Sequence, residues 1–406
     1  MEQNKTLSVL SIPVLVAALG YFVDIYDLLL FSIIRVKSLK GLGLSDALID
    51  TDGKFIISVQ MYGLLIGGII WGIMGDKKGR LSVLFGSIVL YSLANIANGF
   101  VHTVQQYSIC RFIAGIGLAG ELGAGITLVV ELISKEKRGI ATSIVAGVGL
   151  TGAVVAFFVA SEFDWRVCYY IGGGLGFLLL LLRVSVFESG MYKNIRHAAI
   201  QKGNFLMFFS KGRFKKYLLA ILIGLPTWYV IGVLITFSKE FGEYFGLDGP
   251  VEPGKAVMLA YVAIAIGDLL IGFLSNALKS RKKALYIFYA LTVISIVLFF
   301  MQRGGTVTTM YAICAFMGFG TGFWALFVTM AAEHFGTNLR ATAATTVPNM
   351  VRGSLPVILI LFNYLKPMYG YINAGALTGV VVMLISIIAV VMTEETFGKN
   401  LDYIEQ

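Results

Sequence analysis

A series of apolar runs, most of them about twenty residues long, limits what this chain can fold into. A helix of about twenty apolar residues spans the hydrocarbon core of a bilayer, whereas the strands of a membrane barrel give alternating segments of about ten. Apolar residues make up 57% of the 406 residues and charged residues only 14%, about half the charged share of a typical soluble domain. Soluble, secreted and disordered classes are therefore excluded, and we expect an all-α polytopic membrane protein.

Twelve of these runs are long enough to be transmembrane helices. They lie roughly at 9–34, 55–75, 81–101, 106–131, 139–160, 167–187, 216–238, 256–278, 283–301, 307–331, 341–363 and 371–392. The longest polar interruption, 188–215, follows the sixth run and is rich in Lys and Arg. We therefore expect an N-terminal six-helix bundle over 1–187, a cytoplasmic linker over 188–215 and a C-terminal six-helix bundle over 216–406.

The basic residues indicate the orientation of these helices. When both termini are placed on one side, roughly two thirds of the 32 Lys and Arg residues fall on that side, and Arg111 and Arg352 fall inside helices. Cytoplasmic loops of membrane proteins carry such an excess. We therefore expect a protein of the plasma (inner) membrane with both termini in the cytoplasm. The same excess accounts for the net charge of +9 without a nucleic-acid partner.

The two halves of the chain repeat a short charged pattern. Glu131 is followed by Arg138 after the fourth run, and Glu333 is followed by Arg340 after the tenth, so each Glu precedes an Arg by seven residues. The two patterns are separated by about half of the chain length, as expected of a duplicated helical bundle.

Several segments together resemble the major facilitator superfamily, closest to its metabolite:proton symporter and sugar-porter branches. These segments are Gly72-x3-Asp76-x2-Gly79-Arg80, Arg111-Phe-Ile-Ala-Gly-Ile-Gly-Leu-Ala-Gly-Glu121, Glu131 with Arg138-Gly139, Phe187-Glu188-Ser189 and Glu395-Thr-Phe-Gly-Lys399. One departure is informative: the seventh run lacks the Gln and Asn residues with which sugar porters bind hydroxyl groups, so a sugar substrate is disfavoured.

The resemblance implies a gate on the cytoplasmic side, in which carboxylates and guanidinium groups of the two halves pair when the transporter opens outward. The alternative is that these charges only set the topology. The implied gate residues are Asp76, Gly79, Arg80, Glu131, Arg138, Glu333 and Arg340.

Two aspartates of the first run, Asp24 and Asp27, lie at membrane depth, where a charge is costly and usually functional. Helix geometry places Asp27 and Arg111 of the fourth run at the same depth, about 22 Å from the inside. The resemblance implies two pseudo-symmetric bundles around a central cavity that the first and fourth helices line, so we expect an ion pair between them. Arg111 keeps Asp27 ionised while they are paired, and Asp27 takes a proton when the pair separates in a dry cavity. The alternatives are a static ion pair for Asp27 and a position in loop water for Asp24.

Glu121 lies deeper in the fourth run, between glycines. It is either a second titrating group or a packing feature. The candidates for proton coupling are therefore Asp27, Arg111, Asp24 and Glu121.

Arg352 lies near the middle of the eleventh run, beside Pro348, Gly353 and Pro356, which can interrupt the helix and free its carbonyls. A guanidinium offers bidentate donors suited to a substrate carboxylate. The alternative is a structural partner such as Asp268 of the eighth run. The candidate substrate-binding residues are Arg352, Asn349, Trp228, Tyr229, Trp324 and Tyr62.

These residues predict a secondary active transporter that takes up a small organic carboxylate with protons by alternating access. The alternatives are an importer of a zwitterionic amino acid or betaine-type osmolyte, an exporter of drugs or metabolites, and a transporter-like receptor. The sequence has no nucleophile–base set and no cluster with metal-ligand spacing, so we expect no enzyme, no cofactor and no metal. The expected partners are the substrate, protons and the lipid bilayer.

Overall fold

The computed structural model describes most of the chain, in stretches separated by short gaps. The described residues are 8, 10–78, 80–121, 123, 125, 129, 138–188, 205–210 and 212–399, without the side chains of 75–78, 80–81, 138–140, 142–143, 185–188, 337–338 and 341. Within them the secondary structure is helical and contains no β-strand, which confirms the all-α fold class.

Six long helices form the first half of the molecule. They are α1 (Ile12–Gly41), α2 (Asp46–Lys78), α3 (Arg80–Asn98), α4 (Val104–Leu118), α6 (Arg138–Glu162) and α7 (Trp165–Glu188). The predicted loop between the first two runs is almost entirely helical, because α1 continues to Gly41 and α2 begins at Asp46. The sequence prediction ended both runs at their charged residues, but several of these charges are buried inside the protein.

The second half contains more, shorter elements. They are η2 (Phe205–Phe209), α8 (Arg213–Tyr229), the π-helix η3 (Val230–Ile235), α9 (Ser238–Phe245), α10 (Pro253–Leu278), α11 (Arg281–Phe300), α12 (Val307–Gly320), α13 (Trp324–Glu333), α14 (Thr337–Gly353) and α15 (Leu355–Met392).

These elements account for the twelve predicted spans. In the described residues nine segments meet strict criteria of length and hydropathy for crossing a membrane, and the helix Ser82–Asn98 is a shorter apolar one. The short α4 follows it, and the segment Thr342–Met392 contains two spans because Gly370 interrupts α15 with a φ of 77°. The seventh, tenth and eleventh spans are each built from two or more helical pieces.

The interruption of the seventh span has an identifiable cause. Pro226 lies inside α8 and cannot donate to the carbonyl of Leu222, so the hydroxyl of Ser386 donates to that carbonyl instead (2.8 Å). The π-helix η3 follows, and the N–H of Thr236 donates to Ile231, five residues earlier (3.0 Å). Irregular backbone at membrane depth is tolerated where protein groups satisfy it in this way.

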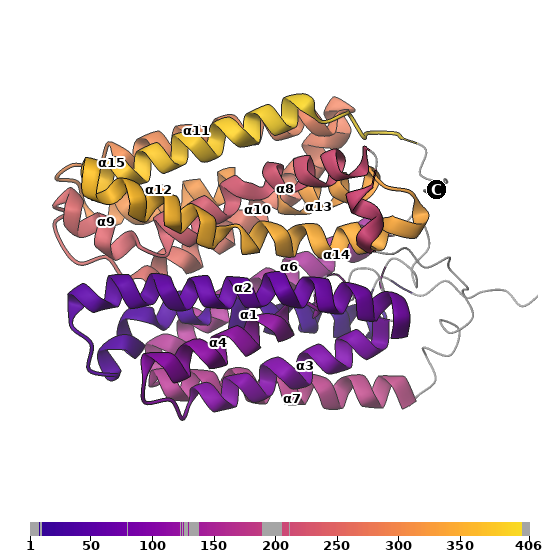
Figure 1. Cartoon of the computed structure of the whole chain (residues 1–406), viewed down its shortest axis with the longest axis horizontal. Helices are drawn as coiled ribbons and strands as arrows, with labels where there is room; N and C mark the ends of the chain where they lie inside the picture. Colours follow the sequence, from indigo (N-terminus) through magenta and orange to yellow (C-terminus); the bar gives the residue numbers. More distant parts are fainter. Residues whose placement is uncertain are drawn as a thin grey trace, which may run out of the picture.

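The helices of the two halves lie on opposite sides of the molecule, with α1 to α7 in one group and α8 to α15 in the other (Figure 1). One end of both groups carries the end of α7 and the start of α8, and we call it the linker end. The other, the far end, carries the connection from α1 to α2 and the helix α9. Across the interface α2 lies along α14 and the start of α15, and α10 lies against α1 and α6.

Glycines allow this close approach. A Cβ atom on Gly68 of α2 would lie 2.8 Å from Cβ of Asn349, and one on Gly72 would lie 3.3 Å from Thr346. The helices α2 and α14 therefore meet with little side-chain bulk between them.

Candidate functional site: buried charges at the interface of the halves

The ion pair expected between Asp27 and Arg111 is present. Nη1 of Arg111 in α4 lies 3.1 Å from Oδ1 of Asp27 in α1, and both side chains have no exposed surface. The agreement in depth that predicted the pair from the sequence is thereby confirmed.

Arg111 is held from several sides. Its Nη2 donates to Oδ1 of Asn95, and its guanidinium lies over the ring of Tyr169, 4.7 Å from the centroid. The hydroxyl groups of Tyr169 and Tyr107 lie 2.8 Å apart, and the hydroxyl of Tyr107 donates to Ser38 (3.1 Å). Residues of α1, α3, α4 and α7 thus fix Arg111 within the first half.

Asp24 faces the second half of the molecule. It is fully buried and does not face loop water, and its Oδ2 lies 3.8 Å from Nη2 of Arg352 in α14. This distance is well beyond the 2.7–2.9 Å of a charge-assisted hydrogen bond. Arg352 also contacts Asn349 (Nη1 to Oδ1, 3.5 Å), and its guanidinium lies 5.9 Å from the ring centroid of Trp324. Arg352 and Asp24 therefore form a loose ion pair between the halves.

The structural partner suggested by the sequence for Arg352 was wrong. Asp268 of α10 accepts a hydrogen bond from the N–H of Ala325 (3.0 Å) in the first turn of α13. A carboxylate at a helix N-terminus satisfies free N–H groups and favours the helix dipole. Asp268 therefore caps the second piece of the tenth span, which begins with Trp324.

Glu121 has a partner that the sequence analysis did not find. Its carboxylate accepts hydrogen bonds from both Nη atoms of Arg183 in α7, and Nη1 lies 3.1 Å from Oε2. Gly20 of α1 makes room for this pair, since a Cβ there would lie 2.2 Å from atoms of both side chains. Arg183 is only 5% exposed, although it lies near the end of the sixth predicted run. Glu121 is thus committed to an ion pair inside the first half.

The other predicted substrate-binding residues lie in three different places. Asn349 and Trp228 are buried at the interface: the Asn349 amide donates to the carbonyl of Ala119 in the first half (2.8 Å), and the indole N–H of Trp228 has no hydrogen-bond partner among the described residues. Tyr229 faces the interior of the second half, where its hydroxyl donates to Gly375 (2.7 Å). Tyr62 is 40% exposed.

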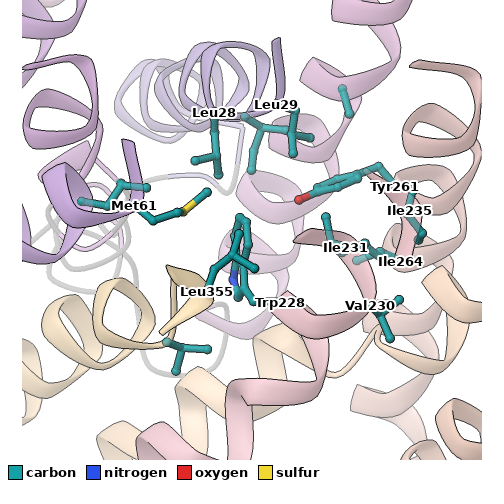
Figure 2. Packing of buried hydrophobic residues seen from close by; sticks show 14 of the residues in the cluster. Leu28, Leu29, Met61, Trp228, Val230, Ile231, Ile235, Tyr261, Ile264 and Leu355 are labelled. Atoms are coloured by element: carbon teal, nitrogen blue, oxygen red, sulfur yellow. The ribbon is translucent and has the colours of Figure 1, made fainter. Parts of the chain in front are cut away.

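Apolar side chains surround this region (Figure 2). Residues from both halves point toward one another, and the hydroxyl end of Tyr261 points toward them. The labelled residues closest to this meeting point are Leu28, Leu29, Met61, Trp228, Tyr261 and Leu355, all buried. These side chains form an apolar part of the interface between the halves, which suits a compact ligand with an apolar body.

A second buried ion pair joins the halves at the far end, and sequence reasoning missed it. Nη2 of Arg35 in α1 donates to both oxygens of Glu240 in α9, at 2.7 and 2.8 Å. The Arg35 side chain is fully buried and lies over the ring of Phe237, 4.5 Å from the centroid. Gly53 of α2 gives it space, since a Cβ there would lie 2.7 Å from Cδ of Arg35.

Asp50 of α2 makes the neighbouring contact between the halves. Its Oδ2 lies 2.8 Å from Nζ of Lys54 and 3.2 Å from Nζ of Lys366 in α15, and its Oδ1 accepts from the hydroxyl of Tyr371 (3.3 Å). The Lys54 ammonium group is within about 5 Å of three aromatic rings, a cation–π arrangement. Arg35, Glu240, Asp50, Lys54, Lys366 and Tyr371 form what we call the far-end cluster.

The predicted gate at the linker end is only partly described. Gly79 and Glu131 lie outside the described residues, as do the side chains of Asp76, Arg80 and Arg138. Glu333 pairs with Arg281 of its own half (3.2 Å) and accepts from the hydroxyl of Thr396 (2.6 Å). The pairing proposed across the halves, for Arg340 as for the others, stays a prediction.

The segment after α15 is anchored beside Glu333. Glu395 accepts hydrogen bonds from the hydroxyl of Ser280 and from the N–H groups of Arg281 and Lys282 at the start of α11, and of Phe397. Partial burial raises the pKa of Glu395, but these hydrogen bonds outweigh it and lower the pKa to about 2. The motif that carried the family resemblance here therefore caps α11.

Comparisons with known proteins agree with this architecture. Residues 17–360 match the sequence profile described as Major Facilitator Superfamily. The niacin transporter NiaP of Acinetobacter baylyi is 26% identical, covering 96% of this chain and 95% of that protein. The gentisate transporter of Corynebacterium glutamicum is 24% identical, covering 84% and 79%. In fold, the crystal structure of a D-xylose-proton symporter is similar, with a TM-score of 0.70 at 17% identity over 97% of this chain and 100% of that one.

Proposed function

Because this chain belongs to the Major Facilitator Superfamily, we propose that it takes up a small organic carboxylate together with protons by alternating access. The protein is a membrane transporter and not an enzyme. The observation that carries the proposal is the buried Arg352, which has only a loose ion pair with Asp24 at the interface of the halves. A guanidinium in such a site is available to a carboxylate, which it can bind through two parallel hydrogen bonds.

The surroundings of Arg352 support a compact organic acid. Leucine, methionine and aromatic side chains of both halves meet at this interface, as an organic acid with an apolar body requires. The named substrates of the two curated relatives, niacin and gentisate, are aromatic carboxylic acids, which fits the same class.

We assign the proton to Asp27. The carboxylate is buried and paired with Arg111, so it stays ionised only while the arginine remains within reach. A rearrangement of α1 against α4 that separates the two groups leaves a buried charge, which a proton removes.

Alternating access requires closures at both ends that form and separate in turn. We propose that the linker end is cytoplasmic, from the excess of basic residues there. The far-end cluster then closes the extracellular side, and the predicted charges around Asp76 and Arg80 close the cytoplasmic side in the opposite state. An ion pair selects between states only when it forms in one of them.

Uptake into proteoliposomes tests the proposal. The full chain is reconstituted, and uptake of labelled nicotinate and benzoate is measured with and without an inward proton gradient, with D-xylose and glycine betaine as comparison substrates. We expect the gradient to accelerate uptake of at least one carboxylate and neither comparison substrate. Carboxylate uptake that is absent, or that is unaffected by the gradient, would contradict the proposal. Selective uptake of glycine betaine would favour the zwitterion alternative.

A further inference from the structure

Asp24 is a buried carboxylate with almost nothing to stabilise its charge. It has no exposed surface, and neither of its oxygens has a hydrogen-bond partner in the described part of the chain. Its one close cation is Arg352, at 3.8 Å. A buried polar group without hydrogen bonds is unfavourable by several kcal/mol in an apolar environment, so the site is incomplete as it stands.

The other ionisable groups near Asp24 do not donate a hydrogen bond to it in this structure. Asp27 and Glu121 are themselves acidic and are bound to Arg111 and Arg183 within the first half. The remaining titratable neighbours are the tyrosines Tyr21 of α1, Tyr91 of α3 and Tyr261 of α10. In α6, which also packs against α1, the described side chains between 144 and 160 carry no charge. Arg352 is therefore the one cation that Asp24 can share with a substrate.

A substrate carboxylate at Arg352 removes this last partner. The guanidinium has the geometry to bind a carboxylate through two hydrogen bonds of 2.7–2.9 Å, which are stronger than its loose contact with Asp24. Asp24 would then be a buried anion beside the carboxylate of the substrate. A substrate that brings its own hydrogen-bond donor to Asp24 avoids this cost, whereas a plain carboxylate does not.

We propose that the substrate is an aromatic monocarboxylate with a hydrogen-bond donor on its ring, whose carboxylate binds Arg352 while the donor binds Asp24. The inference deepens the proposed function and rests on it. Because Asp24 and Arg352 lie side by side, the two polar groups must project from one edge of the ring, which favours the ortho or meta position over the para position. The faces of the ring then contact apolar side chains such as Trp228 and Leu355.

Ligand binding to the purified full chain tests the inference. Dissociation constants are measured by calorimetry for benzoate, 3-hydroxybenzoate, 4-hydroxybenzoate and 3-methoxybenzoate, which keeps the oxygen but lacks the donor. We expect 3-hydroxybenzoate to bind about 10–100-fold more tightly than benzoate or 3-methoxybenzoate, as a hydrogen bond to a buried charge predicts. The para isomer should bind like benzoate.

Two variants separate Asp24 from a general effect of removing an acidic group. In Asp24→Asn the preference for 3-hydroxybenzoate should fall by at least about fivefold, since a neutral acceptor forms a weaker bond. In Asp248→Asn, whose carboxylate accepts from the N–H of Val307 at the far end, the preference should persist. If Asp24→Asn does not fold, titrating wild type from pH 5 to pH 8 gives a second readout: an equal affinity for benzoate and 3-hydroxybenzoate throughout overturns the inference.

The outcomes distinguish the two levels of the proposal. When no carboxylate binds, the proposed function itself fails. When benzoate and 3-methoxybenzoate bind as tightly as 3-hydroxybenzoate, the proposed function stands but recognition of a donor by Asp24 is wrong. In that case a proton on Asp24 takes the place of the substrate's hydrogen-bond donor.

Discussion

Arg35 and Glu240 are separated by 205 residues in the sequence and form an ion pair at the far end of the molecule, in which one arginine nitrogen donates to both carboxylate oxygens. One residue belongs to α1 of the first half and the other to α9 of the second, and the arginine is completely buried. The pair exists only while the halves are closed against each other at this end, so its removal changes the balance between conformations as well as the stability of the protein.

Substituting Glu240→Gln should therefore favour opening of the far end. A bridge of ~1–3 kcal/mol that is present in one state changes the ratio of states by roughly 5–150-fold. The measurement is the rate at which a membrane-impermeant thiol reagent labels Ile33→Cys in a background where Cys110, Cys168 and Cys314 are replaced by Ser. Lys37→Ala is the matched control, because Lys37 donates only to Ala160 and Phe163 of its own half. Equal labelling rates in both variants would remove the pair from the closure.

Asp27→Asn should abolish accumulation of substrate driven by a proton gradient but leave exchange between two substrate pools largely intact. Net transport requires the empty carrier to return after losing its proton, whereas exchange does not. Both rates can be measured in the same proteoliposomes, with Asp248→Asn as a control, since Asp248 caps α12 through Val307 at the far end. Accumulation by the Asp27→Asn variant would show that another group carries the proton.

Arg352→Ala should weaken carboxylate binding more than Arg352→Lys does. Lysine keeps the charge but loses the planar fork, so we expect losses of roughly tenfold for Lys and roughly 100-fold or more for Ala. The readout is the dissociation constant, together with size-exclusion profiles to verify folding. Unchanged affinity in the Ala variant would exclude Arg352 from the substrate site.

Gly20→Ala should destabilise the protein, because the new Cβ would lie 2.2 Å from atoms of Arg183 and Glu121 and would force this buried pair apart. Overpacking of this kind typically costs about 1–3 kcal/mol. Gly147→Ala in α6 is the control, since a Cβ there meets nothing within 4 Å. Thermal unfolding in detergent should show a lower midpoint for Gly20→Ala alone, and equal midpoints would mean that the pair has room to adjust.

Glu395 makes stability depend on acid. Its pKa is lowered from an ordinary 4.5 to about 2 in the folded protein, so the stabilisation is fully present above about pH 4.5 and is lost as the pH falls from 4.5 toward 2. Glu395→Gln should therefore lower the unfolding midpoint at pH 7 and have little effect near pH 2.5. A destabilisation of the same size at both pH values would assign the effect to packing.

The sequence predicted those contacts that depend on depth in the membrane. Asp27 and Arg111 could be matched because each lies within a span whose start is clear, and helix geometry converts position into depth. The twelve spans could also be predicted, because hydropathy marks the segments that lie at membrane depth. Which residues at one depth are neighbours could not be predicted, because depth does not say which way a helix is turned. Arg352 is an example, since Asp24 and not Asp268 lies beside it.

The far-end cluster could not be predicted because a hydropathy scale assigns charged residues to water-exposed loops. Arg35, Lys54 and Glu240 fell at or beyond the ends of predicted runs and were read as loop residues, although all three are less than 10% exposed. Each is buried by contacts with the other half, and a single sequence does not reveal which distant residue provides them.

The closure between Arg35 and Glu240 also bears on how the chain is made. Arg35 is synthesised 205 residues before its partner, which takes on the order of 10–40 s at about 5–20 residues per second. During this time α1 and α2 are already in the membrane with Arg35 lacking the carboxylate that accompanies it in the finished protein. The first half therefore carries this charge at its far end without a carboxylate until α9 is synthesised, and the closure between the halves can form only then.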